Sequence, residues 1–140
     1  MTAGAPDGTP DGTPGGTSSG TPDGPLIYLI AGEPSGDLLG GRLMASLKAK
    51  CPGVRFAGVG GARMAEQGLH SLFPMAELSI MGLAEIVPHI PHLLGRIKET
   101  VADVRARRPA VLVTIDAPEF NFRVAKRLHG QGIPLVHYVA

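Results

Sequence analysis

Four short stretches of this chain are rich in apolar residues and show no alternation between apolar and polar positions. They are Leu26 to Ala31, Val54 to Val59, Val111 to Ile115 and Ile133 to Val139. A strand that is apolar on both sides is typical of a parallel sheet buried between helices. Residues 69–73 allow a further short strand. The pattern therefore predicts an α/β fold, in which a parallel sheet carries helices on both faces.

Between these stretches, apolar residues recur every three or four positions, which is the spacing of a helix. One such helix covers residues 38–50, and another covers residues 119–129 with Phe120, Val124 and Leu128 inward. Gly130 or Gly132 is expected to end the second helix, because glycine readily adopts the backbone conformation that stops a helix.

The longest apolar stripe runs from Ile80 through Leu94 to Val104, and Pro88 and Pro91 must interrupt it. We expect one helix to about residue 87 and a second from about residue 92 to residue 107. The first is apolar nearly all round, so it is either buried in the core or in contact with a membrane or an acyl chain. The residues predicted to make that contact are Ile80, Met81, Leu83, Ile86, Val87 and Ile90.

Residues 1–25 repeat Thr, Pro, Asp and Gly and hold no large aliphatic or aromatic residue after Met1, so we expect a disordered leader. They do not have the pattern of a secretory signal, and a cytoplasmic protein is predicted. All 13 Lys and Arg but only 9 of the 12 acidic residues follow residue 25, a net charge of 13 − 9 = +4. With 4% aromatic residues, this small excess argues against nucleic acid as a partner.

Candidate chemistry lies where the predicted strands end, since open α/β sheets bind ligands at the carboxyl ends of their strands. Asp116 directly follows the third apolar stretch, and it either acts in chemistry or caps the helix that begins near Pro118. His137, near the end of the last stretch, is expected within range of Asp116, and the commoner alternative is a buried histidine that forms a hydrogen bond. No metal or organic cofactor is predicted, because the chain has one cysteine and its histidines lack further ligands nearby.

The turn after the first stretch, Gly32 to Asp37, precedes a helix whose free N–H groups suit an anion. The turn matches neither phosphate-binding glycine pattern, and Glu33 and Asp37 would repel a phosphate, so they favour the hydroxyl groups of a sugar. The alternative is that Glu33 or Ser35 only caps the helix. After the second stretch, Gly60 and Gly61 allow a ligand to approach the backbone. Arg63 could meet a phosphate there, although a plain turn with a solvated arginine is the commoner arrangement.

Five segments, taken together and in order, resemble the amino-terminal half of lipid-A-disaccharide synthase. They are AGEPSGDLLGG, FAGVGGARM, ELSIMGLAEIVP, TIDAPEFNFR and the final VHYV. The family is a two-domain glycosyltransferase of the GT-B type. The resemblance implies that residues 26–140 form a Rossmann-like acceptor-side domain, truncated before the domain that binds the UDP-sugar. The sequence departs from the family pattern at Pro34, Pro88 and Pro91.

The resemblance further implies the condensation of UDP-2,3-diacylglucosamine with 2,3-diacylglucosamine 1-phosphate, which gives the β-1,6 lipid A disaccharide and UDP. Asp116 is then the general base, and Glu33, Ser35, Asp37 and Asn121 position the substrates. Such an enzyme would work at the cytoplasmic face of the inner membrane, with Arg96 and Lys98 as its nearby positive charges. Two alternatives remain open, namely a non-catalytic lipid- or sugar-nucleotide-binding module and another Rossmann-like nucleotide enzyme.

Overall fold

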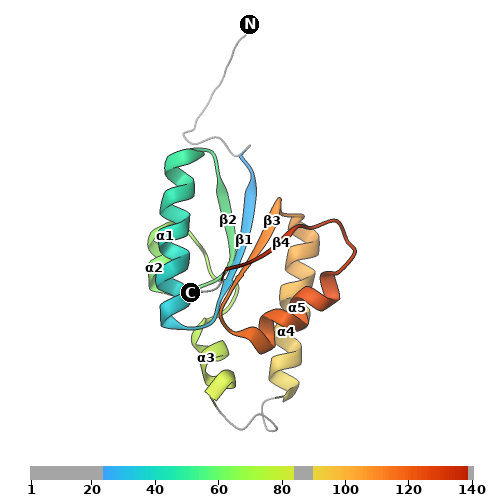
Figure 1. The fold of residues 1–140 in the computed structure, drawn as a ribbon. Helices are drawn as coiled ribbons and strands as arrows, with labels where there is room; N and C mark the ends of the chain where they lie inside the picture. Colours follow the sequence, from blue (N-terminus) through green and yellow to red (C-terminus); the bar gives the residue numbers. More distant parts are fainter. Residues whose placement is uncertain (1–23, 84–89, 139–140) are drawn as a thin grey trace, which may run out of the picture.

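The computed structural model describes residues 24–83 and 90–138, and its centre is a four-stranded parallel sheet (Figure 1). The strands lie in the order β2-β1-β3-β4. The α/β prediction is therefore confirmed, with strand bounds within two residues of the apolar stretches. The strands are β1 (Leu26–Ala31), β2 (Arg55–Val59), β3 (Val111–Ile115) and β4 (Leu135–Tyr138).

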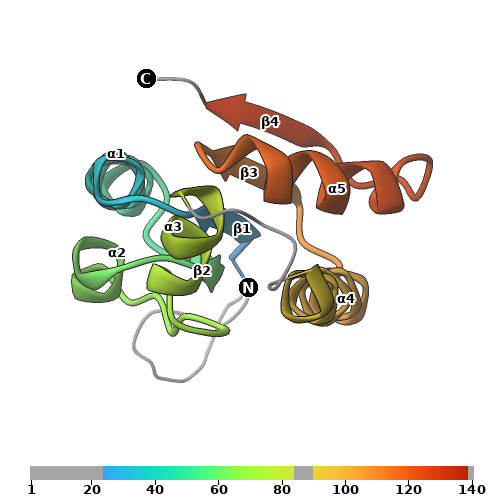
Figure 2. The ribbon, with the colours of Figure 1, turned by 90° about the horizontal axis from the view of Figure 1, so that it is seen from below.

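Helices cover both faces of this sheet, as predicted. Figure 1 shows α1 and α2 on one side and α4 and α5 on the other, and Figure 2 shows the same separation from below. α3 lies below the sheet, at the end where β1 and β3 finish (Figure 1). The helices are α1 (Pro34–Lys50), α2 (Ala62–Glu66), α3 (Ala76–Leu83), α4 (Ile90–Arg107) and α5 (Pro118–Leu128).

The residues of β1 alternate between two hydrophobic clusters, one on each face of the sheet. Tyr28 and Ile30 pack with residues of α4 and α5, whereas Ile27 and Leu29 pack with Met44 and Met64 of α1 and α2. Full burial of an aliphatic side chain of this size stabilises a fold by about 1.5–3 kcal/mol. A strand that is apolar on both sides is thus the central strand of a two-faced core.

The predicted inward face of α4 is confirmed at Ile97, Val101 and Val104, which are buried, but not at Leu94. Leu94 is exposed, and the neighbouring Leu93 is buried in its place. In α1, Leu38 is exposed, and the buried positions include Gly36, Gly40 and Gly41. A Cβ atom at Gly40 would lie 2.6 Å from Met64 Sδ, so the glycine lets α2 pack close to α1.

Two further predictions concern short or interrupted elements. Residues 69–73 form an isolated bridge, between Gly58 and Ser71, where a short strand was expected. α3 is described as far as Leu83, and its predicted end near residue 87 lies outside the described residues. Among the described residues, no helix is both long and apolar enough to cross a membrane. Of the predicted acyl-contact residues, Ile80, Met81 and Leu83 lie in α3 and Ile90 begins α4, while Ile86 and Val87 lie outside the described residues.

The chain connections that follow the two central strands, β1 and β3, run in opposite directions. The chain leaves β1 through α1 toward β2 at one edge, and it leaves β3 through α5 toward β4 at the other edge. Neighbouring parallel strands whose connections diverge leave a crevice at their carboxyl ends, and this crevice is the usual ligand site of open α/β sheets. The turns that follow β1 and β3 therefore define the place to look for function.

Candidate active site

The turn from β3 into α5 places Asp116 at this crevice. Asp116 and Ala117 both have left-handed backbone conformations, with φ of 51° and 44°. Asp adopts this conformation more readily than most residues. The side chain of Asn121 holds the turn, since its Nδ2 donates a hydrogen bond to the carbonyl oxygen of Asp116 at 2.7 Å. Ala117 is the N-cap of α5 and the helix has no side-chain cap, so the interpretation of Asp116 as a cap is wrong.

Only one of the two carboxylate oxygens of Asp116 has a hydrogen-bond partner among the described residues. Its Oδ1 accepts a hydrogen bond from the N–H of Gly32 at 2.6 Å, while its buried Oδ2 has no hydrogen-bond partner among the described residues. Burial raises the pKa of Asp116 to about 6, and the nearby charge of Glu33 adds to the rise. The N–H groups of Gly32, Glu33 and Gly36 face the carboxylate, and they lower its pKa and so partly offset this rise.

Two glycines make room for this carboxylate at the start of α1. A Cβ atom at Gly36 would lie 1.7 Å from Asp116 Oδ2, closer than any non-bonded contact allows. A Cβ atom at Gly32 would lie 2.6 Å from the Cβ of Ala117. The N-terminus of α1 can therefore meet the end of β3 only because positions 32 and 36 carry no side chain.

A hollow of about 310 Å³ opens beside Asp116. It brings together three of the predicted site residues, Ser35, Asp116 and His137, which come from three different segments of the chain. Glu33 is exposed in the turn before Ser35. The wall of the hollow is completed by Gly36, Leu39, Ile115 and Pro118.

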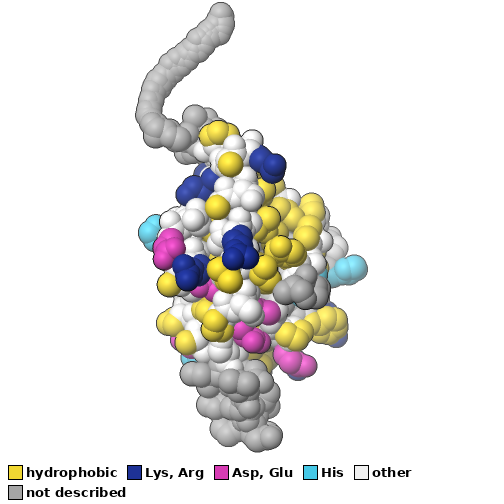
Figure 3. Space-filling model, turned by 60° about the vertical axis from the view of Figure 1, so that its left-hand side comes forward, with side chains coloured by type: hydrophobic (Ala, Val, Ile, Leu, Met, Phe, Trp, Pro, Cys, Tyr) yellow, Lys and Arg dark blue, Asp and Glu magenta, His cyan; other side chains and the backbone are white. Residues whose placement is uncertain are grey.

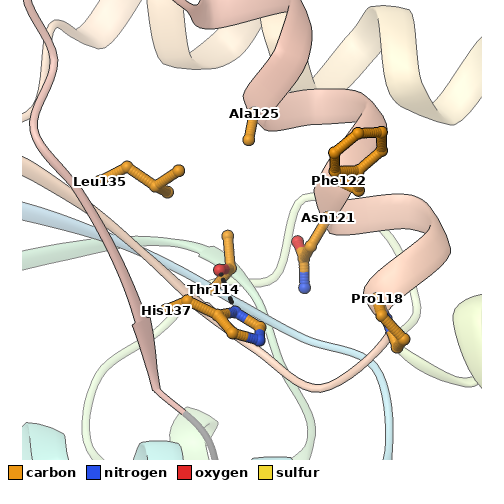
Figure 4. Close-up of a pocket in the computed structure, with 7 residues that line it drawn as sticks. All are labelled: Thr114, Pro118, Asn121, Phe122, Ala125, Leu135 and His137. Carbon is orange, nitrogen blue, oxygen red and sulfur yellow. Dashed lines mark hydrogen bonds between the residues drawn. The ribbon is translucent and has the colours of Figure 1, made fainter.

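His137 is shared with a second hollow, of about 290 Å³, between α5 and β4 (Figure 4). Its Nδ1 lies 2.8 Å from the hydroxyl of Thr114 on β3, within hydrogen-bonding distance. Both His137 and the neighbouring Phe122 are exposed, and Phe122 exposes 68% of its surface. His137 is thus an accessible, oriented imidazole near Asp116, and the alternative of a buried histidine is wrong.

The other predicted residues, Asp37, Gly60, Gly61 and Arg63, form a separate group around the start of α2. The buried Asp37 carboxylate accepts hydrogen bonds from the N–H groups of Gly61, Arg63 and Met64 at 2.9, 2.9 and 3.0 Å. Its oxygens are occupied by backbone donors, so its geometry is that of a structural anchor. The Arg63 side chain lines a different hollow, and none of the four is among the described residues that line the Asp116 hollow.

Another ionic cluster joins α3 to α4. The guanidinium of Arg96 donates to both carboxylate oxygens of Glu77, at 2.8 and 2.9 Å, and to Glu99 at 2.7 Å. Arg96 also lies 4.7 Å from the centre of the Phe73 ring. Its hydrogen bonds hold the pKa of Glu77 down, at about 2. Arg96 was expected to be a positive charge for a membrane, but it is neutralised by two carboxylates.

Residues that the sequence did not single out complete the site. Ser79 lies in α3, a helix whose sequence is mostly apolar, and its hydroxyl donates a hydrogen bond to the carbonyl oxygen of Gly32. No sequence signal pairs these two positions, which are 47 residues apart. In the described part of the chain, no group of three or more His, Cys, Asp or Glu side chains could hold a metal ion.

The distribution of charge bears on what the site could bind. On the face shown in Figure 3, most carboxylates gather toward the lower end and most Lys and Arg side chains lie above them. The lower end is where β1 and β3 finish. None of the described residues that line the Asp116 hollow is Lys or Arg, and Glu33 lies in the adjoining turn, so the site suits neutral hydroxyl groups better than a phosphate placed against the carboxylate.

Comparisons with known proteins agree with this geometry. A sequence model of the family described as lipid-A-disaccharide synthetase matches residues 27–140. Two relatives called lipid-A-disaccharide synthase, from Paramagnetospirillum magneticum and Rhodospirillum centenum, are 58% and 60% identical over 118 residues. The matched region is 82% of this chain and 30% and 29% of those proteins, so the chain spans about a third of their length. This chain belongs to the lipid-A-disaccharide synthase family.

Proposed function

We propose that the chain supplies the acceptor side and the general base of a glycosyltransferase that makes the lipid A disaccharide. The observation that carries this proposal is that Asp116, whose carboxylate has one oxygen without a hydrogen-bond partner in the described structure, lines a hollow at the crevice of the sheet. An alcohol is a poor nucleophile at neutral pH, and an oriented carboxylate that takes its proton accelerates such a reaction by about 100-fold or more. With a pKa of about 6, Asp116 is largely ionised at pH 7 and can accept that proton.

The proposed reaction is the transfer of a glucosamine unit from UDP to a sugar hydroxyl group. Asp116 takes the proton of the 6-hydroxyl group of 2,3-diacylglucosamine 1-phosphate. The oxygen then bonds to the anomeric carbon of UDP-2,3-diacylglucosamine, and the bond from that carbon to the UDP oxygen breaks, with the electron pair leaving on UDP. Attack opposite the leaving group inverts the anomeric carbon. A single carboxylate is sufficient as the base, because UDP leaves as an anion that dipoles and cations stabilise and needs no acid to protonate it. Ser35 and His137, which line the same hollow, are placed to bind sugar hydroxyl groups.

The rest of the reaction falls to parts of the longer relatives that this chain does not match. We assign the UDP-sugar site to that remaining portion, as in a two-domain GT-B enzyme. Both substrates carry acyl chains, which supports a peripheral location on the cytoplasmic face of the inner membrane, with α3 and the residues after it as the acyl contact. Lys98 is the nearby cation that supports this contact, because Arg96 is held by Glu77 and Glu99.

The proposal is tested with a chimera in which residues 26–140 replace the matching segment of the P. magneticum relative. UDP-diacylglucosamine and diacylglucosamine 1-phosphate are supplied in mixed micelles, and disaccharide and UDP are measured. The unmodified relative is the positive control. We expect the chimera to form product and Asp116→Asn to lower kcat by about 100-fold or more, because the amide cannot accept the proton.

Asparagine adopts the left-handed backbone conformation as readily as aspartate, so the substitution changes the chemistry and leaves the turn intact. Equal rates for the chimera and its Asp116→Asn variant would keep the transferase and remove Asp116 as its base. A folded chimera without product would refute the proposal and favour a non-catalytic lipid- or sugar-nucleotide-binding module.

A further inference from the structure

Three consecutive residues of α3 attach this helix to its surroundings in three directions. Glu77 is held by Arg96 of α4, Leu78 is buried in the core, and Ser79 donates a hydrogen bond to the carbonyl oxygen of Gly32. A Cβ atom at Gly32 would lie 3.1 Å from the Cβ of Leu78, so the helix packs directly on the turn after β1. α3 is thus part of the support of that turn.

The peptide that Ser79 binds is the one that joins Gly32 to Glu33. Its carbonyl oxygen accepts the hydrogen bond from Ser79, and its N–H, on Glu33, is one of the backbone donors that face Asp116. The preceding N–H, that of Gly32, is the donor to Asp116 Oδ1 at 2.6 Å. A hydrogen bond to a peptide carbonyl fixes the peptide plane and polarises its N–H, which strengthens the bonds that this N–H makes.

We infer that Ser79 is a positioning residue for the Asp116 carboxylate, acting through the Gly32–Glu33 peptide. It touches neither Asp116 nor the hollow, and by binding the carbonyl oxygen of Gly32 it holds in place the residue whose N–H donates to Asp116 Oδ1. The inference rests on the proposed function only where it concerns catalysis, because the effect on Asp116 itself is a property of this chain.

Removal of the hydroxyl group should weaken the backbone donors and favour the protonated carboxyl group. In Ser79→Ala we therefore expect the pKa of Asp116 to rise above its starting value of about 6. The expected rise is about half a pKa unit, which corresponds to a fraction of the free energy that one hydrogen bond contributes. The measurement is the ¹³C chemical shift of the Asp116 carboxyl carbon against pH in the isotopically labelled 140-residue chain. In the chimera, the acid limb of the kcat profile should move upward by the same amount.

Two variants separate positioning from a general loss of structure. Ser79→Thr keeps the hydroxyl donor and should restore both the pKa and the acid limb. Thr100→Val removes a hydroxyl group that donates to a backbone carbonyl at 2.8 Å, that of Arg96 within α4, and it should leave both unchanged. If Ser79→Ala does not fold, the comparison of Ser79→Thr with Ser79→Cys, a weaker donor, provides the same test.

The outcomes distinguish this inference from the proposed function. An unchanged Asp116 titration in Ser79→Ala would overturn the inference even if the chimera is active and Asp116→Asn is not. A raised pKa in Ser79→Ala that Ser79→Thr reverses would support it, even if the chimera makes no product.

Discussion

Asp37 and Asp116 are two aspartates at the carboxyl-end edge of the same sheet, and their environments are opposite. Both oxygens of Asp37 accept backbone N–H groups, three in all, from the start of α2. Asp116 Oδ1 accepts the N–H of Gly32, and its second oxygen is buried without a partner in the described structure. Asp37 is 5% exposed, and Asp116 adjoins a hollow large enough for part of a ligand.

The difference shows how a fold assigns different tasks to one residue type. A carboxylate whose oxygens accept hydrogen bonds from fixed backbone donors is held in place by them. A carboxylate with a free oxygen and a raised pKa is less stable but available for chemistry. We therefore expect substitution of Asp37 to affect folding and substitution of Asp116 to affect reactivity.

The largest effect on stability is expected for Asp37→Ala. It removes the acceptor of three N–H groups and should lower the free energy of unfolding by about 3 kcal/mol or more. Urea denaturation of the 140-residue chain measures this value. Asp37→Asn keeps an acceptor oxygen and is the matched control, for which a smaller loss is expected. A loss below about 1 kcal/mol in Asp37→Ala would end the interpretation of Asp37 as an anchor.

A smaller effect, of opposite sign, is expected for Asp116→Asn. The pKa of Asp116 is raised from 3.8 to about 6 by folding, so its contribution to stability is complete below pH 4 and lost as the pH rises through 6. The Asp116→Asn variant has no carboxyl group to ionise at this position, so it does not lose stability in this way as the pH rises. Its stability relative to the wild type should increase between pH 4 and pH 7 by at most about 3 kcal/mol. Urea denaturation across this pH range measures the difference, and a flat difference would mean that the pKa is not raised.

The smallest effect is expected away from both aspartates, at Glu77→Gln. Glu77 and Arg96 are each about a quarter exposed, and such pairs contribute about 1 kcal/mol or less. The loss should shrink in 1 M salt, which screens the charges. Glu99→Gln removes only one contact of Arg96, at 2.7 Å, and should cost less still. A cost of about 3 kcal/mol or more at Glu77 would show that the cluster is as strong an anchor as Asp37.

The sequence allowed much of the fold and one central residue of the site to be predicted. Strands that are apolar on both sides identify a two-faced parallel sheet, and Asp116 directly follows one of them. The different states of Asp37 and Asp116 could not be predicted, because each is set by backbone groups 24 to 84 residues away. The contact of Ser79 could not be predicted for the same reason, because its partner Gly32 lies in the turn after β1. Nor could the sequence show that Leu93 is buried and Leu94 exposed, because the two are adjacent on α4 and a small rotation of the helix exchanges them.

The contact between position 36 and Asp116 also restricts which substitutions can accumulate together during evolution. A Cβ atom at position 36 would overlap Asp116 Oδ2, so alanine there is compatible with aspartate at position 116 only if the carboxylate turns away from the orientation seen here. The two positions are therefore expected to change together, and family members that keep the aspartate in this orientation are expected to keep the glycine.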